Sequence, residues 1–190
     1  IQRRATRRGL AEAPIDSGIV ERHYQTRAIR RIAEAFERDH DRKALLVMAT
    51  GAGKTRTVIA LADLLMRCNW AKRVLFLVDT KNLGEQAEQE FMTYLPNDDN
   101  RKFTELYNVQ RLSSNVIAPS SAVVITTIQR LYSILRGENE FTGDEDESAF
   151  TPGGGLPRPA PVSYNAAIPP EHFDVVIVDE CHRSIYSLWR

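Results

Sequence analysis

The sequence predicts an α/β protein, a three-layer arrangement in which helices cover both faces of a mostly parallel sheet. Short runs of Val, Ile and Leu without polar interruption recur along the chain, which is typical of strands buried on both faces. Amphipathic stretches with helical spacing of their apolar residues lie between these runs. The length of 190 residues suits one domain of this kind, with 43% apolar and 26% charged residues.

The first helix is expected over residues 24–39, because Tyr24, Ala28, Ile32 and Phe36 recur every four residues. Strands and helices then alternate. We expect strands at 44–48, 74–78, 103–107, 122–126 and 173–178, and helices at 54–67, 82–94 and 128–135.

Residues 1–20 are interpreted as an irregular lead-in or linker from an upstream domain, and residues 21–190 as the main domain. The pairs Arg3-Arg4 and Arg7-Arg8 in the lead-in are either solvated or in contact with phosphate. Because the chain begins with Ile1 rather than Met, we treat it as a piece of a longer protein. No apolar run approaches the roughly 18–20 residues needed to cross a membrane. Cys68 and Cys181 do not suggest a disulfide framework, so we expect a cytoplasmic location.

Residues 137–172 break the alternation of strands and helices. This segment holds half of the glycines and most of the prolines, and its first part, residues 137–157, has six acidic residues without a Lys or Arg. Such composition favours a mobile surface insertion. The net charge of zero therefore hides a body of the chain that carries +6. A mildly basic body permits nucleic-acid binding without demonstrating it.

The segment Met-Ala-Thr-Gly-Ala-Gly-Lys-Thr at 48–55 lies between an expected strand and an expected helix. That context is typical of a phosphate-binding loop. Glycines let the backbone wrap around a phosphate, and the start of the following helix attracts the same anion. A lysine adds charge for the β and γ phosphates, and the threonine hydroxyl is a ligand for Mg²⁺. We expect the nucleotide phosphates to be bound by Thr50, Gly51, Ala52, Gly53, Lys54 and Thr55.

One position departs from the generic phosphate loop, which opens with Gly or Ala where this chain has Met48. Because only backbone is needed at the end of a strand, the departure leaves the prediction unchanged. The alternative is a glycine-rich turn followed by a surface lysine.

An apolar run at 173–178 leads into Asp179, Glu180, Cys181 and His182. Ligand chemistry in parallel sheets gathers at the carboxyl ends of strands, so this segment and the phosphate loop are expected at one edge. We predict that Asp179 binds Mg²⁺ and that Glu180 is the base that orients the attacking water. These two residues and Lys54 form the expected catalytic set.

A zinc site is the alternative interpretation of the Asp-Glu-Cys-His series. It is disfavoured because successive side chains at a strand end diverge and no second Cys/His pair stands at ligand spacing. His182 is interpreted instead as a relay that couples the nucleotide to the rest of the protein.

The loop ATGAGKT and the box DECH together resemble the first RecA-like motor domain of superfamily 2 helicases and translocases. The resemblance covers residues 21–190 and implies a P-loop NTPase fold with ATP and Mg²⁺ as cofactors. Arg22-His23-Tyr24-Gln25 resembles the glutamine motif of that family, which implies that Tyr24 and Gln25 bind the adenine side of ATP. A plain glutamine on the helix surface is the alternative.

Two further segments resemble the family's nucleic-acid contacts. The segment 78–86 is similar to the one that touches the backbone, which implies contacts from Asp79 and Thr80. The segment 126–129 is similar to the second contact motif, which implies contacts from Thr126, Thr127 and Gln129. The alternative is that the two threonines only end a strand.

Within the superfamily, LLVMATGAGKT, FLVDTKNLGEQ, TTIQRL and VDECHRSIY look most like the motor subunit of type I restriction enzymes. That resemblance implies ATP-driven movement on double-stranded DNA, with modification and specificity subunits as partners and no membrane. It also implies a second RecA-like domain, whose absence would leave the isolated fragment inactive. Alternatives are a type III restriction subunit, a repair or RNA helicase, or a regulatory module that binds ATP without hydrolysing it.

Overall fold

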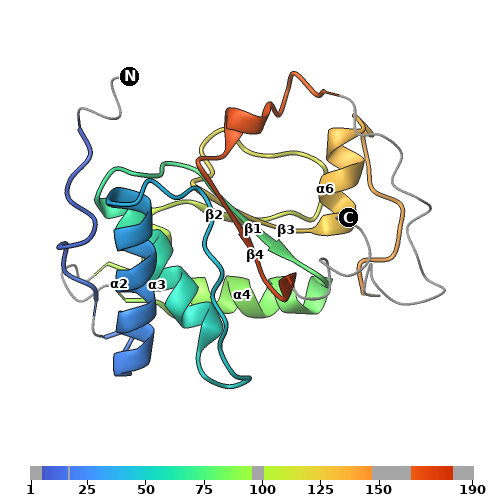
Figure 1. Cartoon of the computed structure of the whole chain (residues 1–190). Coiled ribbons are helices and arrows are strands. Elements are labelled where there is room, and N and C mark those ends of the chain that lie inside the picture. Colours follow the sequence, from blue (N-terminus) through green and yellow to red (C-terminus); the bar gives the residue numbers. More distant parts are fainter. Residues whose placement is uncertain (1–5, 17, 96–100, 147–163, 182–190) are drawn as a thin grey trace. The chain divides into compact units, whose positions relative to one another are not determined.

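The computed structural model describes residues 6–16, 18–95, 101–146 and 164–181. The chain divides into two compact units, one with residues 1–72 and 90–106, and one with residues 73–89 and 107–190. The first unit is helical, and the second contains the parallel sheet (Figure 1). Helix α4, Lys81–Thr93, contributes residues to both.

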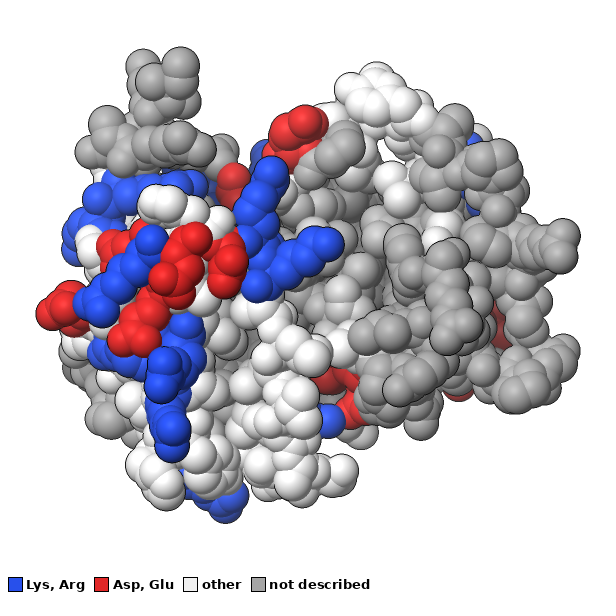
Figure 2. All heavy atoms as spheres, viewed as in Figure 1, with Lys and Arg blue, Asp and Glu red and all other residues white. Residues whose placement is uncertain are grey.

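The first unit contains two helices that pack against each other, α2 at His23–Glu37 and α3 at Lys54–Arg67. The buried face of α2 includes Ile29, which is inaccessible to solvent, and α3 buries Ile59 and Leu64 completely. Basic and acidic side chains alternate over the outer face of α2, at the left of Figure 2. This face therefore does not form a surface of one sign.

The segment before α2 is packed into the first unit. Leu10 is fully buried, and the backbone N–H groups of Leu10 and Ala11 donate to the Glu37 carboxylate at 2.7–3.1 Å. The indole of Trp70 donates to the carbonyl of Arg8 at 2.9 Å. The lead-in is irregular and exposed at Arg7 and Arg8, as expected, but Leu10 and Ala11 are packed rather than solvated, because apolar contacts and side-chain acceptors hold their backbone. Arg3 and Arg4 lie outside the described residues.

The strand expected at 44–48 is not formed. These residues have no regular secondary structure, and Leu45 and Val47 are 70% and 83% exposed. A strand exists only when a neighbour accepts and donates its backbone hydrogen bonds. The described part of the first unit contains no other strand, so the apolar pattern has no partner within the unit.

The strand expected at 103–107 is also wrong, because Phe103–Leu106 forms the short helix α5. The Glu105 carboxylate accepts the backbone N–H of Lys102 at 2.8 Å, which stabilises a helical first turn. Phe103 is buried, with its ring 5.2 Å from that of Phe91 and 5.5 Å from that of Tyr94. The apolar character of this segment is thus explained by packing of aromatic rings, which does not require a β-strand.

The sheet of the second unit has four parallel strands in the order β2-β3-β1-β4. They are β1 (Val74–Val78), β2 (Val109–Arg111), β3 (Val123–Thr127) and β4 (Val175–Val178). Every residue of the central strands β1 and β3 is buried, which explains the apolar sequence of β1 and of the first three residues of β3. The edge strand β4 alternates instead, with Val176 54% exposed and Val178 38% exposed.

Helix α6, Ile128–Leu135, follows β3 directly and packs against the sheet. Ile128 and Ile134 share a core cluster with Leu75 and Leu77 of β1 and Val124 of β3. Ile168 and Phe173, from the segment before β4, pack against the same cluster. That segment contains a single 3₁₀ turn, η1, at Pro170–His172.

The predicted α/β class with a parallel sheet is confirmed, in the form of a RecA-like arrangement. The helices expected at 24–39, 54–67, 82–94 and 128–135 are present with ends shifted by at most two residues. The strands expected at 74–78, 122–126 and 173–178 are also confirmed. None of the helices in the described part of the chain combines the length and apolar character that a bilayer crossing requires.

The described residues of the acidic segment, 137–146, form no helix or strand, as its composition predicts. They are nevertheless attached to the second unit, because Glu145 is paired with Arg130, with side-chain exposures of 12% and 7%. Residues 147–163, where the expectation of a mobile insertion also falls, lie outside the described residues.

Candidate phosphate loop and nucleic-acid contact residues

The predicted phosphate loop is a tight turn at the start of α3. Gly51 and Gly53 have φ angles of +76° and +81°, in the left-handed region that glycine tolerates best. The N–H of Ala52 donates to the carbonyl of Ala49 at 3.1 Å, which closes the turn. The carbonyl of Gly53 accepts from the N–H and the hydroxyl of Thr57, at 3.0 and 2.8 Å, so α3 begins at Lys54.

This turn places Lys54 and Thr55 in the first turn of α3, where both are partly exposed, after an exposed Thr50. The N–H groups at a helix start lack partners within the helix, and the helix dipole adds partial positive charge there. A lysine, a hydroxyl and these N–H groups together suit a polyphosphate anion. The loop and helix start are as the sequence predicts, although the preceding strand is not formed.

Gln25 and Tyr24 of α2 hold the loop from one side. The Gln25 amide donates from Nε2 to the carbonyls of Ala52 and Gly53, at 3.2 and 3.4 Å. Its Oε1 accepts the N–H of Arg22 at 3.3 Å, and Gln25 is only 4% exposed. The Tyr24 hydroxyl donates to the carbonyl of Ala52 at 3.2 Å.

These contacts tie the predicted adenine-binding residues to the predicted phosphate loop, a link that no sequence pattern indicated. A Cβ at Gly53 would lie 2.5 Å from Gln25 Nε2, so a side chain at this position would displace the glutamine amide from the loop. The guanidinium of Arg22 donates to the Tyr24 hydroxyl at 2.7 Å, and this hydrogen bond raises the pKa of Arg22. The alternative of a plain surface glutamine is wrong, because Gln25 is buried.

The acidic pair follows β4 in the second unit. The N–H of Asp179 donates to the carbonyl of Leu77 at 2.9 Å, which continues the pairing of β4 with β1. Asp179 Oδ1 accepts the N–H of Glu180 at 2.9 Å. Glu180 has a φ of +50°, an uncommon conformation for a residue with a side chain that is concentrated at functional sites.

The expected magnesium ligands, Thr55 and Asp179, come from different units. A hydroxyl and a carboxylate are each oxygen ligands of the kind that Mg²⁺ binds. No group of three or more His, Cys, Asp or Glu residues that could hold a metal ion occurs among the residues described. His182, the predicted relay, lies outside those residues.

The two expected nucleic-acid segments meet at the carboxyl ends of neighbouring strands. Val78 of β1 pairs with Thr127 of β3, so Asp79 and Thr80 follow β1 at the same edge. Most of these side chains are buried: Asp79 is 2% exposed, Thr126 3%, Thr127 4% and Gln129 5%. Of the residues expected to contact DNA, only Thr80 is more than marginally exposed.

The structure adds functional candidates that the sequence did not indicate. Arg130 and Glu145 form a partly buried ion pair beside Thr127, and Arg111 of β2 pairs with Glu88 of α4 at 2.8 Å. A small pocket at the same place is lined by Lys81, Thr127 and Glu145, among others. The only sequence signal for this arrangement is the acidic run at 138–147, whose docking partner is not readable from the sequence.

Comparison with known proteins matches residues 18–190 to the family described as "Type III restriction enzyme, res subunit". The endonuclease subunit of the type I restriction enzyme EcoKI from Escherichia coli K12 is 32% identical over 173 residues, which cover 91% of this chain and 12% of that protein. The corresponding EcoAI subunit from Escherichia coli is 31% identical over 177 residues, covering 92% of this chain and 18% of that protein.

A shorter relative is the C-terminal part of the putative type I restriction enzyme MpnIIP endonuclease from Mycoplasma pneumoniae. It is 26% identical over 179 residues, which cover 88% of this chain and 74% of that protein. No solved structure matches. The chain thus spans less than a fifth of the two Escherichia coli relatives. The chain belongs to the type III restriction enzyme res subunit family, the first RecA-like domain of superfamily 2 helicases and translocases, and is homologous to type I restriction enzyme endonuclease subunits.

Proposed function

We propose that this chain is the nucleotide-binding part of an ATP-dependent translocase that moves on double-stranded DNA in a type I restriction enzyme. The observation that carries the proposal is the phosphate loop, with two glycines at positive φ and a buried glutamine amide on its carbonyls. Homology to type I restriction endonuclease subunits supports the restriction assignment.

In this proposal the loop residues 50–55 hold the ATP phosphates, and Lys54 neutralises charge that develops on them during transfer. Gln25 and Tyr24 bind the adenine side while they keep the loop in place. Thr55 and Asp179 hold Mg²⁺, which would offset the charge of the phosphate oxygens. Glu180 orients the attacking water, and the left-handed backbone at this residue supports a specialised role. His182 relays the state of the nucleotide.

The DNA-contacting part of the proposal rests on Asp79, Thr80, Thr126, Thr127 and Gln129. Their segments end neighbouring parallel strands, where ligands of open α/β sheets bind. Modification and specificity subunits, a second RecA-like domain and a cytoplasmic location complete the proposal. A second RecA-like domain would supply an arginine finger worth about 10³–10⁵ in rate. The isolated fragment is therefore expected to bind ATP weakly and to hydrolyse it negligibly.

The test is steady-state ATP hydrolysis by the full-length protein with its partner subunits, with and without long linear duplex DNA. We expect duplex DNA to stimulate turnover and Lys54→Ala to lower it by at least about 10²-fold. Lys43→Ala is the matched control, because Lys43 is an exposed lysine of the same unit and should leave turnover unchanged.

The other outcomes distinguish the alternatives. Stimulation by single strands or RNA alone would favour a repair or RNA helicase of the same superfamily. ATP binding without hydrolysis under any condition would favour a regulatory module. Unchanged hydrolysis in Glu180→Gln would remove the assignment of Glu180 as the base.

A further inference from the structure

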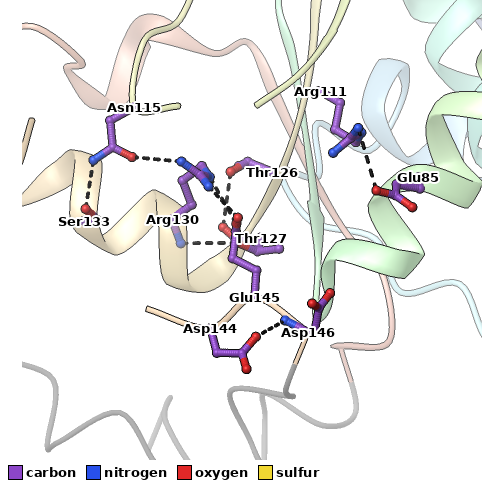
Figure 3. A network of polar contacts seen from close by, with 10 residues as sticks. All are labelled: Glu85, Arg111, Asn115, Thr126, Thr127, Arg130, Ser133, Asp144, Glu145 and Asp146. Atoms are coloured by element: carbon purple, nitrogen blue, oxygen red, sulfur yellow. Dashed lines mark hydrogen bonds and ion pairs between the residues drawn. The ribbon is translucent and has the colours of Figure 1, made fainter. Parts of the chain in front are cut away.

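A carboxylate of the acidic segment occupies a cradle of donors at the end of β3 (Figure 3). Glu145 Oε2 accepts from Arg130 Nη2 at 2.5 Å, and Oε1 accepts from Arg130 Nε at 3.1 Å. Oε1 also accepts from the Thr127 hydroxyl at 2.5 Å. The backbone carbonyl of Glu145 accepts the N–H of Lys81, the first residue of α4, at 2.8 Å.

These donors are of the kinds that bind phosphate in proteins. A guanidinium presents two parallel N–H groups to an anion, and hydroxyls and backbone N–H groups are common contacts of the nucleic-acid backbone. The cradle therefore matches the chemistry of a phosphodiester as well as that of a carboxylate. Its donors come from Arg130, Thr127 and Lys81, within or beside the segments that the sequence assigns to the nucleic-acid backbone.

Contacts that do not involve Glu145 hold the cradle in shape. Arg130 Nη1 donates to Asn115 Oδ1 at 3.4 Å, and the Asn115 amide in turn donates to Ser133 Oγ at 2.8 Å (Figure 3). The Thr127 hydroxyl also accepts the N–H of Arg130 at 3.3 Å, as the cap of α6. A guanidinium already fixed in position loses less conformational freedom when it binds an anion.

Glu145, which occupies the cradle, is by contrast not part of a helix or strand. Glu145 lies in an irregular part of the chain, 15 residues after Arg130 and 18 after Thr127, within a run rich in acidic residues. Its charge is of the same sign as a phosphate. A permanent structural ion pair would need only the side chains of Arg130 and Glu145. Here Glu145 also accepts hydrogen bonds from the Thr127 hydroxyl and from the Lys81 N–H.

We propose that Arg130, the Thr127 hydroxyl and the Lys81 N–H form a binding site for a backbone phosphate of duplex DNA, and that Glu145 is its internal competitor. This inference rests on the proposed function. DNA binding then exchanges one anion for another and releases the acidic segment from the strand end. Because both anions use the same donors, anything that weakens the hold of Glu145 strengthens DNA binding.

The test is the affinity of the full-length protein for a fluorescently labelled duplex, measured by anisotropy at one fixed salt concentration. Glu145→Gln should bind about tenfold more tightly than the wild type, because the loss of one charged hydrogen-bonding partner is of that size. Glu140→Gln is the matched control: Glu140 is an exposed carboxylate of the same segment, and its removal should change affinity by less than about twofold.

A second variant tests the cradle itself. Arg130→Gln should weaken duplex binding by about tenfold. In the Arg130→Gln background, the further substitution Glu145→Gln should no longer change affinity, since occupant and DNA would have lost the same donor. Thermal melting of each variant establishes that it is folded. If Arg130→Gln does not fold, the duplex affinities of Glu145→Gln and Glu140→Gln are sufficient to test the inference.

Two outcomes would overturn the inference, and they differ. If Glu145→Gln and Glu140→Gln bind the duplex with equal affinity, Glu145 does not compete with DNA, and the proposed function stands. Absence of duplex binding in every variant, together with hydrolysis that duplex DNA does not stimulate, removes the proposed function and the phosphate site with it.

Discussion

Two candidate anion sites in the described part of the chain are built in different ways. The phosphate loop at 49–53 is made of backbone, shaped by two glycines at positive φ and held by the Gln25 amide on its carbonyls. The cradle around Glu145 is made of side chains, and Arg130 and Thr127 supply most of its donors. A backbone site depends on conformation, whereas a side-chain site depends on which residues the fold brings together.

This difference predicts how each site fails. Substitutions in the loop should act through backbone strain and loss of shape, even when no charge changes. Substitutions in the cradle should act through single hydrogen bonds and charge, and should leave the sheet and α6 in place.

The largest effect is expected for Gly53→Ala. A side chain in the left-handed region costs about 1–2 kcal/mol, and the new Cβ would lie 2.5 Å from Gln25 Nε2. We expect the free energy of unfolding, measured in urea, to fall by more than about 2 kcal/mol, since a buried amide is also displaced. Gly51→Ala is the matched control, with a similar φ but nothing within 4 Å, and should cost only about 1 kcal/mol. Equal losses in the two variants would contradict the role of Gln25.

The second largest effect is expected for Gln25→Ala. It removes hydrogen bonds to Ala52, Gly53 and Arg22 from a side chain that is 4% exposed. The free energy of unfolding should fall by about 1–3 kcal/mol. Calorimetric titration should show weaker binding of both ATP and GTP, with the larger loss for ATP if Gln25 also reads adenine. An equal loss for the two nucleotides would restrict Gln25 to holding the loop.

In the cradle, Thr127→Val should lower the free energy of unfolding by about 1 kcal/mol, the usual worth of a helix cap. The substitution removes the hydroxyl that caps α6 and donates to Glu145 while it keeps the shape of the side chain. Thr127→Ser retains the hydroxyl and should be close to the wild type in the same urea titration. A serine variant as unstable as the valine variant would show that packing, rather than the hydroxyl, matters here.

The smallest effect concerns pH and the second unit. Burial, together with the nearby Arg73 guanidinium, lowers the pKa of His172 below its ordinary value of 6.5. His172 therefore binds a proton more readily in the unfolded chain than in the folded one. Its contribution to the free energy of unfolding is fully present above pH 6.5 and is lost as the pH falls through the lowered pKa. We expect the melting temperature of the wild type to decline with acidity below that pH more than that of His172→Gln. His40→Asn, at an exposed histidine of the first unit, should follow the wild type.

Elements whose pattern is local were predictable from the sequence. The periodicity of α2, the apolar runs within β1 and β3, and the strand-end position of Asp179 all follow from neighbours along the chain. The glycine spacing of the phosphate loop predicted a tight turn at a helix start, and Gly51 and Gly53 adopt the conformations that such a turn needs. These features depend on steric rules that act within a few residues.

The outcomes at 44–48 and at 103–107 were not predictable, because an apolar run indicates that a segment is buried or paired but not which segment it contacts. Residues 44–48 have the pattern of a strand but find no strand within the described part of their unit, and Phe103 is buried by Phe91 and Tyr94 in a helical turn. The burial of Leu10 depends likewise on contacts with residues far along the chain, such as Glu37.

By itself, the sequence determined the α/β class, the phosphate loop and the acidic pair, since each is encoded in a continuous stretch. Only the tertiary structure decided that the Gln25 amide supports the loop and that Glu145 lies on Arg130 and Thr127. Both are contacts between segments that are separate in the sequence. They exist because burial forces each polar group to find a hydrogen-bonding partner, and the fold determines which partners are within reach.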